Sequence, residues 1–340
     1  MHAVLLAAAL LIGCLLAVQA SVNLQLNKAV GTPYGASALQ LGVATALLAV
    51  PAVAVGGIGA ARLVPDVPLW HLLGGLASPL YITSGILLFP RLGALAAVGL
   101  FVTGQMSASL ALDLLGVLGV PRKPLSAGVV LGAAAVLAGI TVVIRSQRAA
   151  RPSASSAPAA QPAAGPVGGS AGTATAPAVP AVAAGTGGAG QWGWIALGLV
   201  AGAALPVQGA INAQLRRDLE QPMTVATISF IVATLTILVV LLLLLALRRT
   251  PRPRLRPLSG MPWWGWLGGA CAAAYVTATF MLIPEIGAAT TVALTVTGQQ
   301  AASAAIDDRG LFRLPARPLT GPRLGGLALL IAGSVLVQLT

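Results

Sequence analysis

The chain has little charge for its size. Only 8% of its 340 residues are charged, whereas hydrophobic residues make up 57% and the mean hydropathy is +0.92. A soluble domain carries roughly 25% charged residues. A chain this poor in charge would precipitate from water, so its expected solvent is the lipid bilayer.

Cysteine and recognisable catalytic motifs are also scarce. The two cysteines, Cys14 and Cys271, both lie inside apolar runs, which argues against a disulfide framework and a Cys-based metal site. No Gly-rich phosphate-binding loop occurs, so nothing supports an ATP-driven pump. No nucleophile–base motif or metal-ligand spacing stands out either. We therefore expect no enzyme activity and no cofactor or metal.

Basic residues outnumber acidic ones, 19 to 7, giving a net charge of +12. Such an excess often indicates nucleic acid or anionic lipid as a partner. Here the basic residues lie between apolar runs and do not form one polar face. Binding to nucleic acid is therefore not expected, and the charges are interpreted as a signal for membrane topology.

Apolar runs of about the length that a bilayer requires, roughly 20 residues, are the main feature of the chain. The first has only His2 at its start and lacks the basic segment of a signal peptide, so we predict a retained helix. The stretch 152–190 contains Ala, Pro, Gly, Ser and Thr without charge, which is typical of a disordered linker. The predicted spans lie near 3–26, 35–56, 69–90, 92–113, 125–145, 193–216, 224–247, 263–283, 287–306 and 322–339.

An internal repeat divides these ten runs into two sets of five. The segment VQASVNLQLN at 18–27 recurs as VQGAINAQLR at 207–216, a shift of 189 residues. Further along, the shift is 194, and PLWHLLGG at 68–75 recurs as PWWGWLGG at 262–269. The ordered matches predict a duplicated five-helix unit. The expected parts are a first repeat at 1–146, a linker at 147–190 and a second repeat at 191–340.

A unit of five helices ends on the opposite side of the membrane from its start. Because the linker does not cross the membrane, the second unit begins on the side where the first one ended, and the two units have opposite orientations. This predicts an inverted-topology repeat, an architecture of secondary transporters. If the linker side is cytoplasmic, that side carries 14 of the 19 basic residues. The positive-inside rule then places the linker in the cytoplasm and both termini outside a multi-pass cell-membrane protein.

Three segments in order carry a resemblance: PVQGAINAQL, then PWWGWLGG, then TGQQAASAAIDDRG. They resemble the five-helix YdcZ-type family of the drug/metabolite transporter (DMT) superfamily, here as two fused units. The resemblance covers nearly all of both halves and excludes the linker. It implies a secondary transporter that exports a small metabolite or drug-like molecule, and it supplies no substrate. The first copy departs from the pattern, with DLLG in place of DDRG.

Polar side chains recur at steps of four residues, and so on one helix face, within the expected spans. One interpretation is that they hydrogen-bond between helices and fix packing. The other is that they line a substrate path, which the length of the polar stripes favours. The candidate path residues are Gln19, Asn23, Gln105, Ser109, Gln208, Asn212, Gln299 and Ser303.

Asp113 and Asp307 are the only carboxylates in these stripes. Carboxylates within membranes often relay protons, so both are candidates for proton coupling. The alternative is that both sit at helix ends and face lipid headgroups.

Two other functional classes stay open at this point. One is a channel, with a continuous pore in place of alternating gates. The other is a membrane scaffold or lipid-handling protein that transports nothing. The expected partners are a small-molecule substrate and the lipid bilayer, and the sequence leaves the oligomeric state open.

Overall fold

A computed structural model describes residues 2–120, 122, 126–149, 188–286 and 288–339, and within these ranges the regular structure is helical throughout. The first half contributes α1 (His2–Val30), α2 (Pro33–Ala54), α4 (Ala77–Leu92), α5 (Ala94–Leu115) and α6 (Ala127–Ala149). The second half contributes α7 (Gly188–Leu219), α8 (Pro222–Ala246), α9 (Leu267–Ile286), α10 (Ala288–Arg309) and α11 (Gly321–Leu339). The predicted linker lies almost wholly outside the described residues.

Short helices connect these ten. They are α3 (Gly57–Ala61) and the 3₁₀ helices η1 (Val64–Asp66), η2 (Leu69–Leu76), η3 (Arg256–Gly260), η4 (Trp263–Trp266) and η5 (Leu311–Arg313).

Two predicted spans, 69–90 and 263–283, begin as 3₁₀ helices, η2 and η4, before they continue as α4 and α9. Both starts follow a proline, Pro68 or Pro262, which is the N-cap residue of the 3₁₀ turn. At the end of the turn a glycine packs against the other half: a Cβ on Gly75 would meet the carbonyl of Ser229. The sequence predicted these two spans in the right places but not their tighter first turns.

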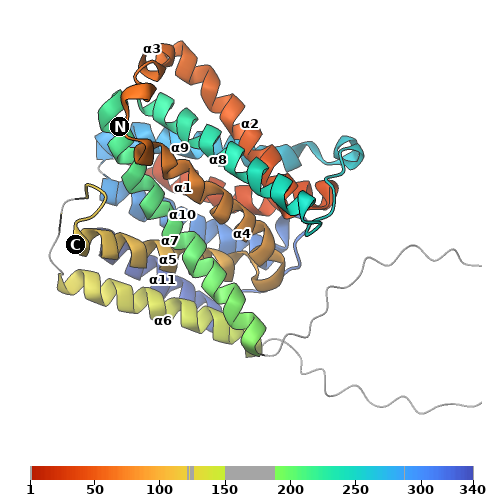
Figure 1. Ribbon diagram of the computed structural model, residues 1–340. Helices are drawn as coiled ribbons and strands as arrows, with labels where there is room; N and C mark the ends of the chain where they lie inside the picture. Colours follow the sequence, from red (N-terminus) through yellow and green to blue (C-terminus); the bar gives the residue numbers. More distant parts are fainter. Residues whose placement is uncertain (1, 121, 123–125, 150–187, 287, 340) are drawn as a thin grey trace, which may run out of the picture.

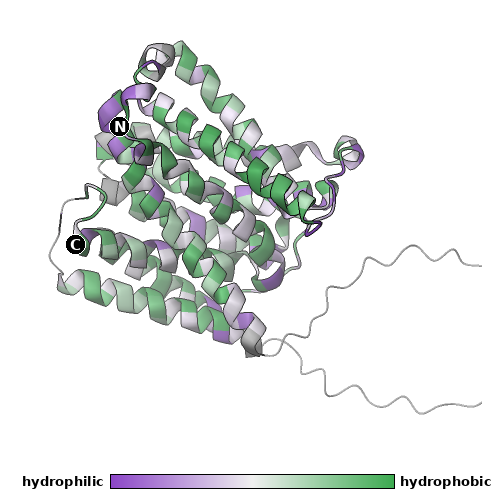
Figure 2. Cartoon of the chain, in the orientation of Figure 1, coloured by the Kyte–Doolittle hydropathy of each residue, from purple (hydrophilic) through white to green (hydrophobic). Residues whose placement is uncertain are grey.

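Seven spans in the described part of the chain are long and apolar enough to cross a membrane; they comprise α1, α2, η2 with α4, α5, α6, α7 and α8. The other three predicted spans are present as α9, α10 and α11. The apolar part of α11 is 17 residues, Gly321–Val337, and α10 carries much of the polar stripe. Figure 2 shows hydrophobic residues along most of each long helix. The chain is an all-α membrane protein, as predicted.

The packing of the helices repeats under exchange of the two halves. Helix α1 packs against α10, and its counterpart α7 packs against α5, the counterpart of α10. The pairs α2–α8 and α6–α11 each join a helix to its own counterpart. In Figure 1 both termini lie on the left, and α6 ends beside the start of α7 at the lower right. We call these two sides the terminal face and the linker face.

Close helix contacts between the halves depend on glycine. A Cβ on Gly298 of α10 would collide with the backbone carbonyl of Leu10 in α1. The counterpart contact, Gly104 of α5 against the carbonyl of Leu199 in α7, is equally tight. Small residues at such crossings let helix backbones approach each other in membranes. The duplicated glycines therefore fix how the two halves dock.

We expect Gly298→Val to destabilise the protein by about 1–3 kcal/mol, because the added carbons must push two backbones apart. Gly42→Ala is the matched control, since nothing lies within 4 Å of a Cβ at that helical position. That control should be neutral or stabilising, because alanine favours helix over glycine. Thermal melting in detergent measures both variants. A melting temperature for Gly298→Val at or above that of Gly42→Ala would contradict this account of the docking.

Candidate functional site: a polar cavity between the halves

A cavity of about 220 Å³ lies between helices α1, α4, α7, α8 and α9. Its walls mix amide and hydroxyl groups with aliphatic and aromatic side chains, as small-molecule sites do. The polar lining residues are Gln19, Ser78, Tyr81, Gln208, Asn212, Ser229, Tyr275 and Thr279. The rest are Leu16, Ile82, Leu205, Gly209, Ala226, Phe230, Ala272 and Val276.

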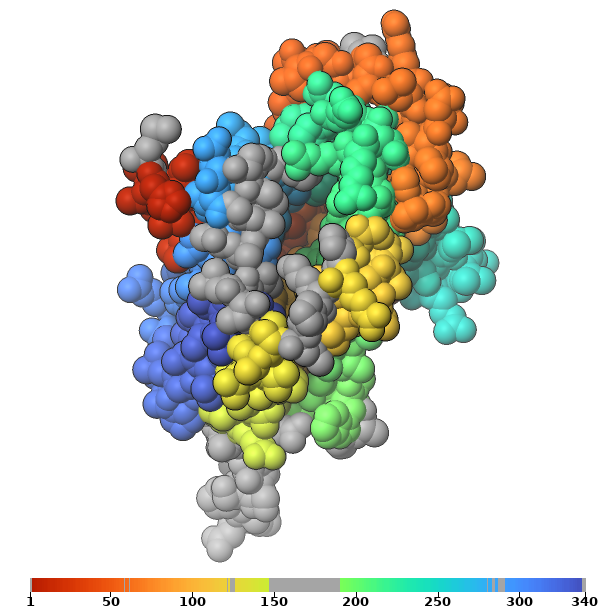
Figure 3. All heavy atoms as spheres, turned by 90° about the vertical axis from the view of Figure 1, so that its left-hand side faces the viewer, coloured from red at the N-terminus to blue at the C-terminus, as the bar shows by residue number. Residues whose placement is uncertain are grey.

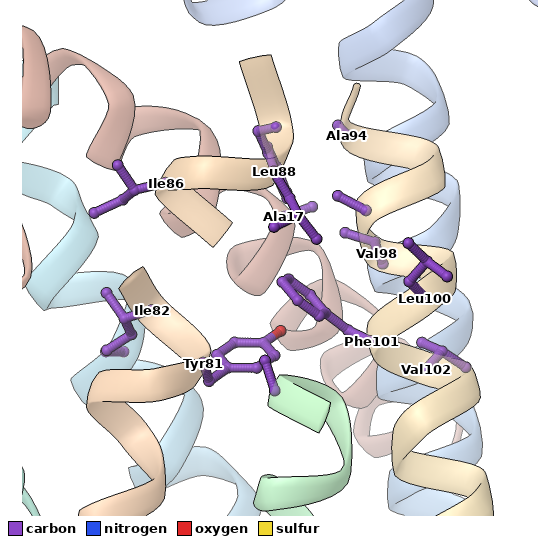
Figure 4. Close-up of a cluster of buried hydrophobic side chains, with 14 of the residues drawn as sticks. Ala17, Tyr81, Ile82, Ile86, Leu88, Ala94, Val98, Leu100, Phe101 and Val102 are labelled. Atoms are coloured by element: carbon purple, nitrogen blue, oxygen red, sulfur yellow. The ribbon is translucent and has the colours of Figure 1, made fainter. Parts of the chain in front are cut away.

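Part of the lining, which we call the floor of the cavity, is made of the repeat-related pairs Gln19 with Gln208 and Tyr81 with Tyr275. Figure 4 shows Tyr81 beside Phe101, and their ring centroids are 4.7 Å apart. The cavity therefore sits where the two halves meet, near the pseudo-two-fold axis that relates them.

The lining residues whose counterparts do not line the cavity all come from the second half. Asn212 and Ser229 line the cavity, whereas their counterparts Asn23 and Gln40 do not. Asn212 is half-buried, whereas Asn23 is 2% exposed. Asn212 is near the end of α7 on the terminal face, and Ser229 is near the start of α8 on the same face. Figure 3 looks onto this face and shows it hollowed beside the green atoms of α8. The cavity thus extends from the axis toward the terminal face.

Side-chain length accounts for this asymmetry. On the linker face Asn23 Nδ2 donates to Gln40 Oε1 at 3.2 Å, and Gln40 Nε2 reaches the carbonyl of Gly268 at 3.5 Å. The long amide of Gln40 therefore bridges three helices. On the terminal face Asn212 Nδ2 donates to Ser229 Oγ at 3.1 Å. The shorter serine makes the equivalent bond but leaves space beside it.

The repeated Gln–Asn–Gln motif divides into two roles. Gln19, Gln208 and Asn212 line the cavity. The third amide of each copy points elsewhere and holds a loop: Gln25 Nε2 donates to the carbonyl of Phe312, and Gln214 Nε2 donates to that of Leu118, each at 2.8 Å. Only Gln19, Gln208 and Asn212 are therefore placed to meet a ligand in this state.

The second predicted stripe does not line this cavity. Gln299 lies directly behind the wall, because its Nε2 donates to the Tyr81 hydroxyl at 3.0 Å. Ser303 bonds within its own helix, to the carbonyl of Gln300. Ser109 lines a separate cavity of about 200 Å³ together with Asp113. Gln105 is half-buried on α5 and lines neither cavity. A path through all eight predicted residues stays a prediction.

Asp307 is inside the protein, with 1% of its surface exposed. Its carboxylate accepts hydrogen bonds from the backbone N–H of Ala94 at 2.7 Å and of Leu95 at 3.2 Å, the first residues of α5. Arg323 Nη2 donates to the same group at 2.8 Å. An anion at a helix N-terminus satisfies free N–H groups and complements the helix dipole. In this structure Asp307 therefore joins α10, α5 and α11 at the linker face.

Several lining residues were not found from the sequence. Tyr81 and Tyr275 match each other in the repeat at the shift of 194 residues, and that match is a signal that could have found them. Ser78 and Ser229 gave none, because the repeat places Ala272 and Gln40 at the corresponding positions. A comparison of the two halves identifies residues that are the same in both. Ser78 and Ser229 contribute to the site at positions where the two halves differ, so that comparison does not identify them.

A family model, described as "Putative inner membrane exporter, YdcZ", matches the chain twice, at residues 4–142 and 193–336. The chain belongs to the YdcZ family. The two matches make it a fused two-unit YdcZ protein and a member of a family of membrane exporters. This confirms the resemblance and the multi-pass membrane location. No curated protein matches the chain.

Proposed function

We propose that this YdcZ protein is a secondary transporter that moves a small molecule by alternating access through the cavity between its halves. The observation that carries the proposal is the cavity's asymmetry at a pseudo-two-fold interface. Residues of one half line an approach from the terminal face, and their counterparts are closed against each other at the linker face. Secondary transporters with inverted repeats bind substrate at the repeat interface and rock one repeat against the other.

The repeat also describes the second state. If the halves exchange conformations, Asn23 and Gln40 separate at the linker face, and the second-half counterparts close at the terminal face. Gln19 and Gln208 stay at the floor in both states, because the repeat relates them to each other. A substrate held at the floor would then meet the same pair of amides from either side. With the linker cytoplasmic and the termini outside, as the basic residues predict, the present state faces outward.

Cysteine labelling in sealed cells tests both the gating and the orientation. Cys14 and Cys271 are first replaced by alanine, and a single cysteine is then placed at Asn212 or at Asn23. An impermeant maleimide should modify Asn212→Cys from outside, because that residue lines the outward-facing cavity and is only half-buried. The matched Asn23→Cys should react at least about tenfold more slowly, because Asn23 is buried in the closed linker-side contact.

Each other labelling pattern has a defined meaning. Equal rates at the two positions would indicate a continuous pore and therefore a channel. Labelling of Asn212→Cys only after the cells are opened would place the terminal face in the cytoplasm and refute the assigned orientation.

A further inference from the structure

Two amides that the repeat makes equivalent have different hydrogen-bond partners. Gln208 is fully paired with protein: its Nε2 donates to Ser78 Oγ at 2.9 Å and to Ser229 Oγ at 3.3 Å, and Ser78 Oγ donates to its Oε1 at 3.0 Å. Gln19 Oε1 is buried and has no partner among the described residues. Gln19 is 5% exposed and lines the cavity.

Two substitutions between the halves account for the difference. Ser78, which bonds Gln208, corresponds in the repeat to Ala272. Alanine has no hydroxyl group that could donate a hydrogen bond to Gln19. The position of Ser229 is occupied by Gln40, which pairs with Asn23 instead. Burying an acceptor without a hydrogen-bond partner is unfavourable, because the acceptor loses its bonds to water and gains none in return. One side chain of the cavity lining, Gln19, therefore has an acceptor that no other described residue fills.

The lining also limits the charge of a ligand. None of the residues that line the cavity in the described part of the chain is Asp, Glu, Lys, Arg or His. An ion that left water for this site would lose its hydration without gaining a countercharge, which is strongly unfavourable. Hydroxyls and amides can meet a neutral polar group, and side chains such as Leu16, Leu205 and Phe230 can cover an apolar one.

We propose that Gln19 Oε1 accepts a hydrogen bond from the transported molecule, which is small, uncharged and carries a donor group beside an apolar part. This inference rests on the proposed transport function and names its substrate class. The volume of about 220 Å³ is below the roughly 300–1,000 Å³ typical of drug-sized ligand pockets. The ligand is therefore of metabolite size.

Three probes of nearly the same shape test the charge preference: benzamide is neutral, benzoate is an anion and benzamidinium is a cation. Their binding to the purified full chain in detergent is measured by equilibrium dialysis. We expect benzamide to bind at least about tenfold more tightly than either ion. Gln19→Glu places a carboxylate at the floor and should reverse the order in favour of benzamidinium, because charge-assisted hydrogen bonds are the stronger ones.

The missing partner gives a sharper test. Ala272→Ser supplies Gln19 with the hydroxyl that Gln208 has in Ser78, so it should weaken benzamide binding about three- to tenfold through internal competition. Gln19→Leu should weaken it at least as much. Ala46→Ser is the matched control, because it makes the same change at an exposed position of α2 and should leave binding unchanged. Thermal melting shows that each variant is folded.

The outcomes separate the substrate class from the transport function. Absence of benzamide binding up to about 10 mM, equal binding of all three probes, or unchanged binding in both Gln19→Leu and Ala272→Ser would overturn the inference. Binding in the expected pattern without counterflow of benzamide in proteoliposomes would leave the site standing and would overturn transport as its function.

Discussion

Asp307→Leu is expected to lower the free energy of unfolding by about 3–5 kcal/mol, because it leaves the buried guanidinium of Arg323 without its counter-ion. Arg323 is only 4% exposed, so water cannot take the place of the carboxylate. The change also removes the acceptor for the N–H groups of Ala94 and Leu95, which costs about 1 kcal/mol for a lost helix cap. Denaturant titration in detergent measures the loss.

The double variant Asp307→Leu/Arg323→Leu is the decisive comparison. Replacing a whole buried ion pair by apolar residues is often neutral, so this protein should recover all but the cost of the cap. Asp113→Leu is the matched control in the first half, because Asp113 is half-buried and borders the second cavity. It should cost much less than Asp307→Leu. An equal decrease in the free energy of unfolding for Asp307→Leu and Asp113→Leu would show that the Asp307–Arg323 ion pair does not stabilise the protein more than Asp113 does.

Proton coupling is a separate hypothesis for the same carboxylates. If either one carries the coupled proton, its Asp→Asn variant should transport with a flattened pH dependence and remain folded. In this structure Asp307 is bound to Arg323 and to the start of α5, whereas Asp113 borders a cavity. A pH profile unchanged in both Asp→Asn variants would leave the carboxylates with a purely structural role.

Transport should fall at least about tenfold in Gln208→Leu and in Asn212→Leu, while the protein stays folded. Each change removes cavity-facing polar groups and one of the two amide N–H groups that donate to Ser229 Oγ. Loss of one interhelical hydrogen bond in a membrane averages only about 0.6 kcal/mol, which is too little to unfold ten helices. The measurement is efflux or uptake in proteoliposomes, with melting in detergent as the control for folding.

Gln214→Leu is the matched control for these variants. It is the same change in the same helix, but its side chain bonds the carbonyl of Leu118 and does not line the cavity. It should affect melting more than transport. Gln19→Leu and Asn23→Leu should impair transport too, the first at the floor and the second at the opposite gate. Normal flux in all four cavity and gate variants would show that the amides only hold helices together, as in a membrane scaffold.

The architecture could be predicted from the sequence because the same five-helix pattern occurs in both halves of the chain. Hydropathy placed ten spans, and Gln19 and Asn23 aligned with Gln208 and Asn212, which fixed the repeat. The contacts that define the site were not predictable in the same way. Whether Asn23 meets Gln40 or Asp307 meets Arg323 depends on the distance between helices far apart in the chain, and hydropathy carries no information on that distance.

The polar stripes show the limit of periodicity. Steps of four correctly put Gln299, Ser303 and Asp307 on one face of α10, but a helix in a bundle has neighbours on several sides. Near its end on the linker face, that face meets the start of α5, so Asp307 serves as a cap. About two turns earlier, Gln299 donates to the Tyr81 hydroxyl behind the cavity wall. The four-residue period therefore predicts which side chains share one face of α10. The contact partner of each side chain depends on its position along the helix.

If the protein works by the alternating access proposed above, the difference between Gln40 and Ser229 has a consequence for its resting state. Two identical five-helix units in antiparallel arrangement would have inward- and outward-facing states of equal free energy, because turning the dimer over converts one into the other. Fusion removes that degeneracy, since each half can then mutate alone. A longer side chain in one gate and a shorter one in the other shift the equilibrium, by tenfold in population for each 1.4 kcal/mol. Evolution of the fused chain can thus set the direction it faces at rest without altering a residue at the cavity floor.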